Sequence, residues 1–169
     1  MDDALATMLT LVTRGNQLTE NDLDWVDQQM ILPAVPAVLP DAPAEDITGD
    51  TLIFANEHLH RIGAIIGAAL VRQAQVNILA LTVQPWYVHM VYQPASTPPD
   101  RIRMVAEDAL RRLFQSALPI WAPDYAKRFL FEEEEVASWV DYIERHNQAA
   151  GWEPRPWPFI ARPCKGSGA

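Results

Sequence analysis

Cysteine is almost absent from this sequence: Cys164, near the C-terminus, is the only one among 169 residues. A single thiol cannot close an internal disulfide, so the sequence excludes a disulfide-stapled secreted domain. The opening residues, Met1-Asp2-Asp3, carry the opposite charge to the start of a secretory signal. We therefore expect a cytoplasmic protein.

Long apolar runs and an excess of basic residues are also lacking. The longest apolar run, 62–71, has about half of the roughly 20 residues that a membrane-spanning helix needs. The net charge is −9, and lysine occurs only at Lys127 and Lys165. Nucleic acids and anionic lipids are bound by clustered Lys and Arg side chains. The sequence therefore predicts no membrane partner and no direct contact with nucleic acid.

The negative charge that is present has an uneven distribution. Residues 1–50 contain ten acidic side chains and one basic side chain, Arg14, whereas residues 51–169 contain twelve of each sign. The whole net charge therefore belongs to the first 50 residues. This pattern predicts an acidic attachment surface joined to an electrically balanced body.

Glycine is scarce relative to proline, with seven glycines against fourteen prolines. Proline fixes the backbone dihedral φ, so we expect stiff, extended connections. Four prolines lie within 33–50, where they favour a polyproline II linker, and four more lie in the C-terminal segment 152–169. The sequence therefore predicts four parts: an acidic helical pair (1–32), a Pro-rich linker (33–50), a core α+β domain (51–151) and a Pro- and aromatic-rich tail (152–169).

Hydrophobic periodicity predicts a helix-rich α+β fold. Apolar residues recur at helical spacing in five stretches, at about 2–14, 19–31, 51–73, 97–114 and 124–148. One region is rich in β-branched and aromatic residues and predicts two strands, at about 77–83 and 86–92. A hairpin is the simpler arrangement, and one strand bent at Pro85 is the alternative. We expect about five helices around this small antiparallel β region, followed by an extended Pro-rich tail.

Gly63 and Gly67 lie inside the longest predicted helix, where each costs about 1 kcal/mol relative to alanine. Such a cost is explained if another element passes close to the helix backbone. Trp157 and Phe159 in the Pro-rich tail are costly to leave in water, since burying one such side chain gains roughly 1.5–3 kcal/mol. We expect the tail to dock in a groove, on its own domain in preference to another subunit.

No pattern of residues indicates catalysis. No serine or cysteine lies in a nucleophile-elbow context, and no glycine-rich loop resembles a phosphate cradle. Glu57, His60 and His89 are weak candidates for a single metal site, because metal sites usually need three or four convergent ligands. We therefore predict no enzyme activity, no catalytic residues and no cofactor.

The charge pattern favours a non-enzymatic protein-binding module, an accessory or inhibitory factor of the immunity or anti-defence type. Its partner would be a protein with a basic surface, because aromatic anchors supply affinity and surrounding charge raises the association rate. The predicted partner-binding residues are acidic or aromatic: Asp22, Asp24, Trp25, Asp27, Asp41, Asp46, Asp50, Trp152, Trp157 and Phe159.

Two other functions remain open at this point. The first is a structural or assembly subunit of a larger viral or secretion particle, in which the linker and tail reach neighbouring copies of a homo-oligomer. The second is a metal-dependent enzyme that uses Glu57, His60 and His89.

Overall fold

The computed structural model describes residues 3–15 and 52–161. The elements of this part follow in the order β1 (Ala6–Thr13), α2 (Leu59–Ala69), β2 (Asn77–Gln84), β3 (Tyr87–Gln93), α3 (Pro99–Phe114), β4 (Trp121–Leu130) and α4 (Glu133–Ala149). A short 3-10 turn, Asn56–His58, precedes α2, and a π-helical turn, Leu70–Ala74, extends it.

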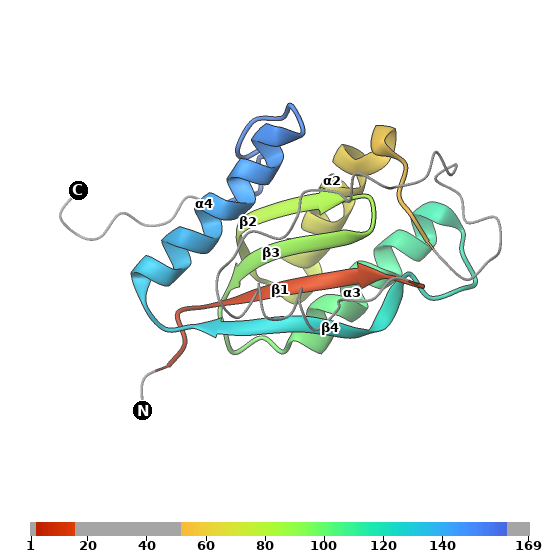
Figure 1. Cartoon of the computed structure of the whole chain (residues 1–169). Helices are drawn as coiled ribbons and strands as arrows, with labels where there is room; N and C mark the ends of the chain where they lie inside the picture. The colour runs from red at the N-terminus through yellow and green to blue at the C-terminus, as the bar shows by residue number, and fades with distance from the viewer. Residues whose placement is uncertain (1–2, 16–51, 162–169) are drawn as a thin grey trace.

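The strands form a four-stranded sheet in the order β2-β3-β1-β4, and each neighbouring pair is antiparallel (Figure 1). β3 lies between β1 and β2, so the crossover through α2 joins two strands that run parallel but are not adjacent. The crossover through α3 likewise joins two parallel strands that are not adjacent, β3 and β4, because β1 lies between them. This is the split β-α-β-β-α-β arrangement, to which α4 is added after the last strand.

Helices cover both faces of the sheet. α2 and α3 lie behind the sheet in Figure 1, and α4 crosses its front. Leu9 and Leu11 of β1 belong to the core cluster packed with α2 and α3, whereas Ala6 and Met8 belong to the cluster packed with α4. Alternate residues of a strand point to opposite faces, so one strand supplies both cores.

The prediction of five helices around two strands is wrong, and the first error is at the N-terminus. Residues predicted as a helix over 2–14 form the central strand β1, and all eight of its residues are buried. A strand buried on both faces carries apolar residues without clean alternation, so its pattern also fits a helix. Thr7, Thr10 and Thr13, β-branched residues that favour strands, are the signal that the helical spacing obscured.

The second error concerns residues 124–148, predicted as one helix. Trp121–Leu130 form the edge strand β4, and α4 begins only at Glu133. Apolar residues four positions apart, such as Tyr125 and Phe129, share one face in a strand as well as in a helix. Pro123 is compatible with β4 because an edge strand has N–H positions that need no partner.

The predicted hairpin lies where expected, since β2 and β3 fall within one residue of the predicted strands and Pro85-Trp86 connect them. The predicted helix 19–31 and the linker 33–50 lie outside the described residues. The division of the chain into four parts stays a prediction. Within the described ranges, no helix combines the length and apolar character required to cross a membrane.

The C-terminal segment 152–161 docks on the body of the molecule. The indole Nε1 of Trp157 donates to the carbonyl oxygen of His60 on α2, at 2.9 Å. Further along, Ile160 forms a single parallel bridge with Ile78 at the β2 edge, and the Ala161 N–H donates to the Ile78 carbonyl at 2.7 Å. Docking within the chain, as expected from the cost of exposed aromatics, is confirmed for these residues.

Candidate functional site

The candidate site begins on the sheet face that α4 crosses. His89 of β3 pairs with Thr10 of β1 on one side and with Thr82 of β2 on the other, so these three residues form a row across the sheet. His89 is fully buried, and its Nδ1 lies 2.5 Å from Oγ1 of Thr10. We assign the threonine hydroxyl as the donor to this nitrogen, because the Met8 sulfur, 3.7 Å away, is a thioether and so the weaker acceptor. The proton of a neutral His89 ring then lies on Nε2.

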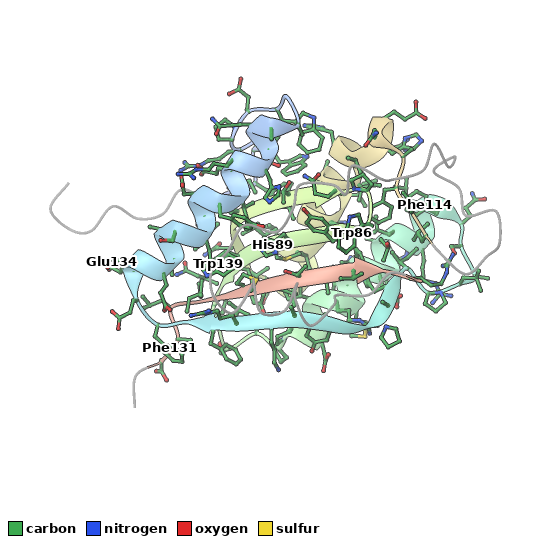
Figure 2. The ribbon with its side chains drawn as sticks, in the orientation of Figure 1. Trp86, His89, Phe114, Phe131, Glu134 and Trp139 are labelled. Atoms are coloured by element: carbon green, nitrogen blue, oxygen red, sulfur yellow. The ribbon has the colours of Figure 1, made fainter. Side chains whose placement is uncertain are left out.

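α4 adds three more aromatic rings to this cluster, two of them in contact with His89. Trp139, Tyr142 and His146 lie three and four residues apart and therefore share one helical face. The ring centroids of Trp139 and Tyr142 lie 5.6 Å and 5.4 Å from that of His89, and those of Tyr142 and His146 are 4.8 Å apart. Figure 2 shows His89 on the sheet with Trp139 beside it.

Several polar atoms in this cluster are buried without a hydrogen-bond partner among the described residues. They are the Tyr87 hydroxyl, His89 Nε2, Trp139 Nε1 and His146 Nε2. Leaving a buried polar group unpaired costs about 1–3 kcal/mol, so native structures rarely contain several together. Four such atoms between one strand and one helix mark this cluster as the candidate functional site.

Burial also changes the protonation of this cluster. It lowers the pKa of His89 to about 3, with a smaller contribution from His146, and it lowers the pKa of His146 itself. It raises the pKa of Tyr87, with Tyr142 adding to the effect. Both imidazoles are therefore neutral near pH 7. Perturbed titratable groups gathered in this way are typical of functional sites.

The arrangement brings the ring of Tyr142 into contact with two neutral imidazoles, those of His89 and His146. A tyrosine hydroxyl is a weak nucleophile until a neighbouring group takes its proton, and a neutral imidazole can do so. Tyr142 has such an imidazole one helical turn away in His146. Two N–H groups, on His89 and Trp139, and the Tyr87 hydroxyl are available as donors near the same phenol.

Most residues predicted to contact a partner lie outside the described ranges: Asp22, Asp24, Trp25, Asp27, Asp41, Asp46 and Asp50. The other three lie on the docked C-terminal segment. Trp157 is buried in the core beside α2, and Trp152 and Phe159 are partly buried against the same cluster. The role of these ten residues in partner binding stays a prediction.

The structure does not bring together the metal ligands suggested by the sequence. Glu57 faces His58, with Oε1 to Nε2 at 3.7 Å, and the His60 ring packs against Trp152 and Trp157. His89 lies on the α4 side of the sheet, whereas Glu57 and His60 lie at or before the start of α2 on the other side. Over residues 3–15 and 52–161, no three His, Cys, Asp or Glu side chains gather as a metal site would require.

Sequence reasoning named His89 but missed Tyr87, Trp139, Tyr142 and His146. One signal was available: Trp139, Tyr142 and His146 occupy helical spacing within the predicted stretch 124–148. A polar aromatic face of this kind differs from the purely apolar face of a core helix. The partner strand could not be predicted, because β3 and α4 are about 50 residues apart and meet only through the topology.

Comparison with family models and with curated proteins finds no match to this sequence. Solved structures do align with this chain. A REP-associated tyrosine transposase bound to a REP hairpin aligns with a TM-score of 0.51 and 13% identity, over 94% of this chain and 76% of that one. A protein from Deinococcus radiodurans R1 described as a candidate transposase aligns with a TM-score of 0.40 and 17% identity, over 85% of this chain and 91% of that one.

The first likeness shows the fold and contradicts our functional predictions. The similar protein is a transposase and was captured with a nucleic-acid hairpin, so a non-enzymatic inhibitor, an assembly factor and a protein without direct nucleic-acid contact were the wrong expectations. The exclusion of nucleic acid rested on a net charge that belongs to residues 1–50. The remainder is balanced, so its total charge excludes no partner.

Proposed function

We propose that this chain is a transposase-like enzyme that binds hairpin-forming nucleic acid and breaks a phosphodiester bond with Tyr142 as the nucleophile. One observation carries the proposal: Tyr142 is held between His89 and His146, in a chain whose fold resembles that of a tyrosine transposase over 94% of its length. The term tyrosine transposase describes the similar protein, and the buried Tyr–His cluster is what supports extending it to this chain.

The reaction follows from ordinary acid–base chemistry. The Tyr142 oxygen attacks the phosphorus atom, and His146 takes up the phenolic proton. The new bond joins this oxygen to phosphorus, and the bond from phosphorus to the departing nucleotide oxygen breaks. The proton on His146 then passes to that departing oxygen, which leaves as a hydroxyl. The products are a phosphotyrosine-linked strand and a free hydroxyl end, and His146 returns to its neutral form.

The donors around Tyr142 would stabilise the charge that develops on the phosphoryl oxygens. His89 Nε2–H, Trp139 Nε1–H and the Tyr87 hydroxyl have no partner among the described residues and so remain available. Donors already fixed in a site of low polarity cost little reorganisation when the transition state forms. Thr10 contributes by holding the other nitrogen of His89.

The test is the formation of a covalent adduct between the full chain and synthetic DNA hairpins with single-stranded extensions. We expect a denaturation-resistant adduct that Tyr142→Phe abolishes, while the affinity for the hairpins is retained. Tyr125→Phe is the matched control, because the Tyr125 hydroxyl donates to Asp100 Oδ1 at 2.6 Å, away from this cluster. An adduct that survives Tyr142→Phe, or hairpins bound no more tightly than unstructured strands, would contradict the proposal.

A cytoplasmic location remains part of this proposal, since a nucleic-acid substrate is accessible there.

A further inference from the structure

A second feature lies beside the Tyr–His cluster, at the C-terminal end of α4. It is a cavity of about 270 Å³ whose walls come from three parts of the chain. The 3-10 turn and the start of α2 supply Asn56 and Leu59, and the end of β2 supplies Gln84. The end of α4 and the segment that follows supply His146, Ala149, Ala150 and Trp152.

The polar groups of this cavity are placed for a ligand. His146 is 6% exposed, and its Nε2 has no hydrogen-bond partner in the part of the chain that the structure describes. Gln84 is 5% exposed, and its Nε2 donates to Thr82 Oγ1 at 3.0 Å, which fixes the carboxamide. Asn56 adds a second carboxamide at the exposed rim. An aromatic ring, a fixed amide and the imidazole of His146 thus line one space.

The electrostatics of the cavity favour a neutral ligand over a phosphate. None of the described residues that line it is Lys, Arg, Asp or Glu. The cavity also lies at the end of α4, where the helix dipole is negative and disfavours an anion. Burial lowers the pKa of His146, so the ring supplies no positive charge near pH 7.

We propose that this cavity binds one unpaired base of the nucleic acid, through the carboxamides of Gln84 and Asn56 and the imidazole of His146, with Trp152 against the ring of the base. Proteins that read unstacked bases combine an aromatic surface with hydrogen-bonding groups in this way. Carboxamides pair with the N6 and N7 atoms of adenine, so adenine is the expected preference.

This inference rests on the proposed function, because it assigns the base to the nucleotide beside the phosphate that Tyr142 attacks. His146 belongs to both places: its ring lies 4.8 Å from that of Tyr142, and it lines the cavity. A base seated in the cavity would therefore position its own nucleotide near the phenol. The site that selects the sequence and the site that reacts share one side chain.

The first experiment does not depend on catalysis. The full chain is titrated with adenosine, guanosine, cytidine or thymidine while the NMR signals of the Trp152 indole N–H and the His146 ring are followed. We expect saturable shifts of both signals, largest with adenosine, and none with inorganic phosphate at equal concentration. Nucleosides that move neither signal, or phosphate that moves both, would overturn the inference.

The second experiment fills the cavity. Ala149→Trp places an indole in this space, and Ala137→Trp makes the same change in a separate cavity beside α4, of which Ala137 is a lining residue. The probe is a DNA hairpin with a single-stranded adenine extension, compared with the same hairpin carrying abasic sites. We expect Ala149→Trp to weaken binding of the adenine probe by about 5- to 150-fold, the range for one stacked base, and Ala137→Trp to leave it unchanged.

The abasic probe separates this inference from the proposed function. If Tyr142 forms an adduct but the wild-type chain binds both probes equally, the cavity does not hold a base and the proposed function stands. If adenosine binds and Ala149→Trp blocks it, but no adduct forms, the base site stands and the role of Tyr142 fails.

Discussion

The indole ring of Trp157 occupies the space that a side chain at Gly63 would need. A Cβ atom added to Gly63 would lie 2.7 Å from Cε2 of this indole and closer still to Cζ2. Gly67, one turn further along α2, has the same relation to the ring of Phe159. The two glycines thus form a groove in which the C-terminal segment lies, and the Trp157 bond to the His60 carbonyl fixes its register.

Gly63→Ala is therefore expected to destabilise the protein although alanine is the better helix former. Overpacking costs about 1–3 kcal/mol, and the gain in helix propensity is about 1 kcal/mol. We expect a net loss of up to about 2 kcal/mol in the free energy of unfolding, measured by urea titration. Ala68→Gly is the control: at this exposed position of α2, the change in unfolding free energy measures the difference in helix propensity between alanine and glycine without any overpacking.

A double mutant shows whether Trp157 is the cause. In a Trp157→Leu background the smaller side chain leaves room at position 63, so Gly63→Ala should become neutral or stabilising. The same loss in both backgrounds would mean that the indole contact does not explain the glycine.

The second prediction concerns Asn147 of α4, whose side chain links this helix to β2 and to the C-terminal segment. It is fully buried, and its Nδ2 donates to the carbonyl oxygens of Leu81 at 2.9 Å and Pro154 at 3.0 Å. Asn147→Asp removes both donors and turns an acceptor toward the carbonyls. We expect a loss of about 2–4 kcal/mol in unfolding free energy, because each buried carbonyl left unpaired costs about 1–3 kcal/mol.

The neighbouring exposed residue provides the control for this change. Gln148→Glu introduces a charge at the same end of α4, and we expect it to alter stability by no more than about 0.5 kcal/mol. Comparable losses from both variants would show that added charge, not the lost amide donors, weakens the molecule.

These packing relationships show what the sequence could predict. Two glycines in a strong helix predicted a close neighbour, because glycine lowers helix stability unless another element needs the space. Aromatic residues in a Pro-rich tail predicted docking, because leaving such side chains in water costs free energy. The β2–β3 hairpin was equally accessible, since both strands are rich in β-branched or aromatic residues. The central strand β1 was not, because a strand buried on both faces lacks the alternation that distinguishes strand from helix.

The candidate site could be predicted only in part, for a related reason. His89 stood out as a lone histidine in a β region, but no sequence pattern shows which helix covers that strand face. Tyr142 and His146 occur among Val136, Val140 and Ile143, so they looked like members of one core face. The functional prediction failed through charge, since a total of −9 was applied to a protein whose residues 51–169 are electrically balanced.

The run of acidic residues at 132–135 caps α4, and this gives the third prediction. Glu132 and Glu135 form a reciprocal capping box, and Glu135 also accepts from the Phe131 N–H at 3.1 Å and pairs with Arg128 at 3.4 Å. Glu135→Ala should lower the unfolding free energy by about 0.5–2 kcal/mol, as loss of a helix cap does. Glu134→Ala, exposed in the same turn (Figure 2), should have a much smaller effect on chemical denaturation.

The last prediction concerns pH and follows from the buried imidazoles. The folded state holds His89 and His146 neutral, with the pKa of His89 lowered to about 3, whereas an unfolded chain protonates them below about 6.5. The unfolded state therefore binds more protons, so stability is complete above pH 6.5 and falls as the pH decreases toward 3. His89 contributes a slope of up to about 1.4 kcal/mol per pH unit within that window, and His146 adds to the slope as the pH falls below 6.5.

The range from pH 6.5 to 5 isolates the histidines, because Glu135, whose pKa its backbone and Arg128 contacts lower, adds its own loss only below 4.5. Urea titrations across this range should give a steep loss of stability in the wild-type chain. His146→Gln should flatten the slope, whereas His58→Gln, at an exposed position before α2, should leave it unchanged. An unaltered slope in His146→Gln would mean that this imidazole binds protons equally in the folded and unfolded states, so that burial beside Tyr142 does not hold it neutral.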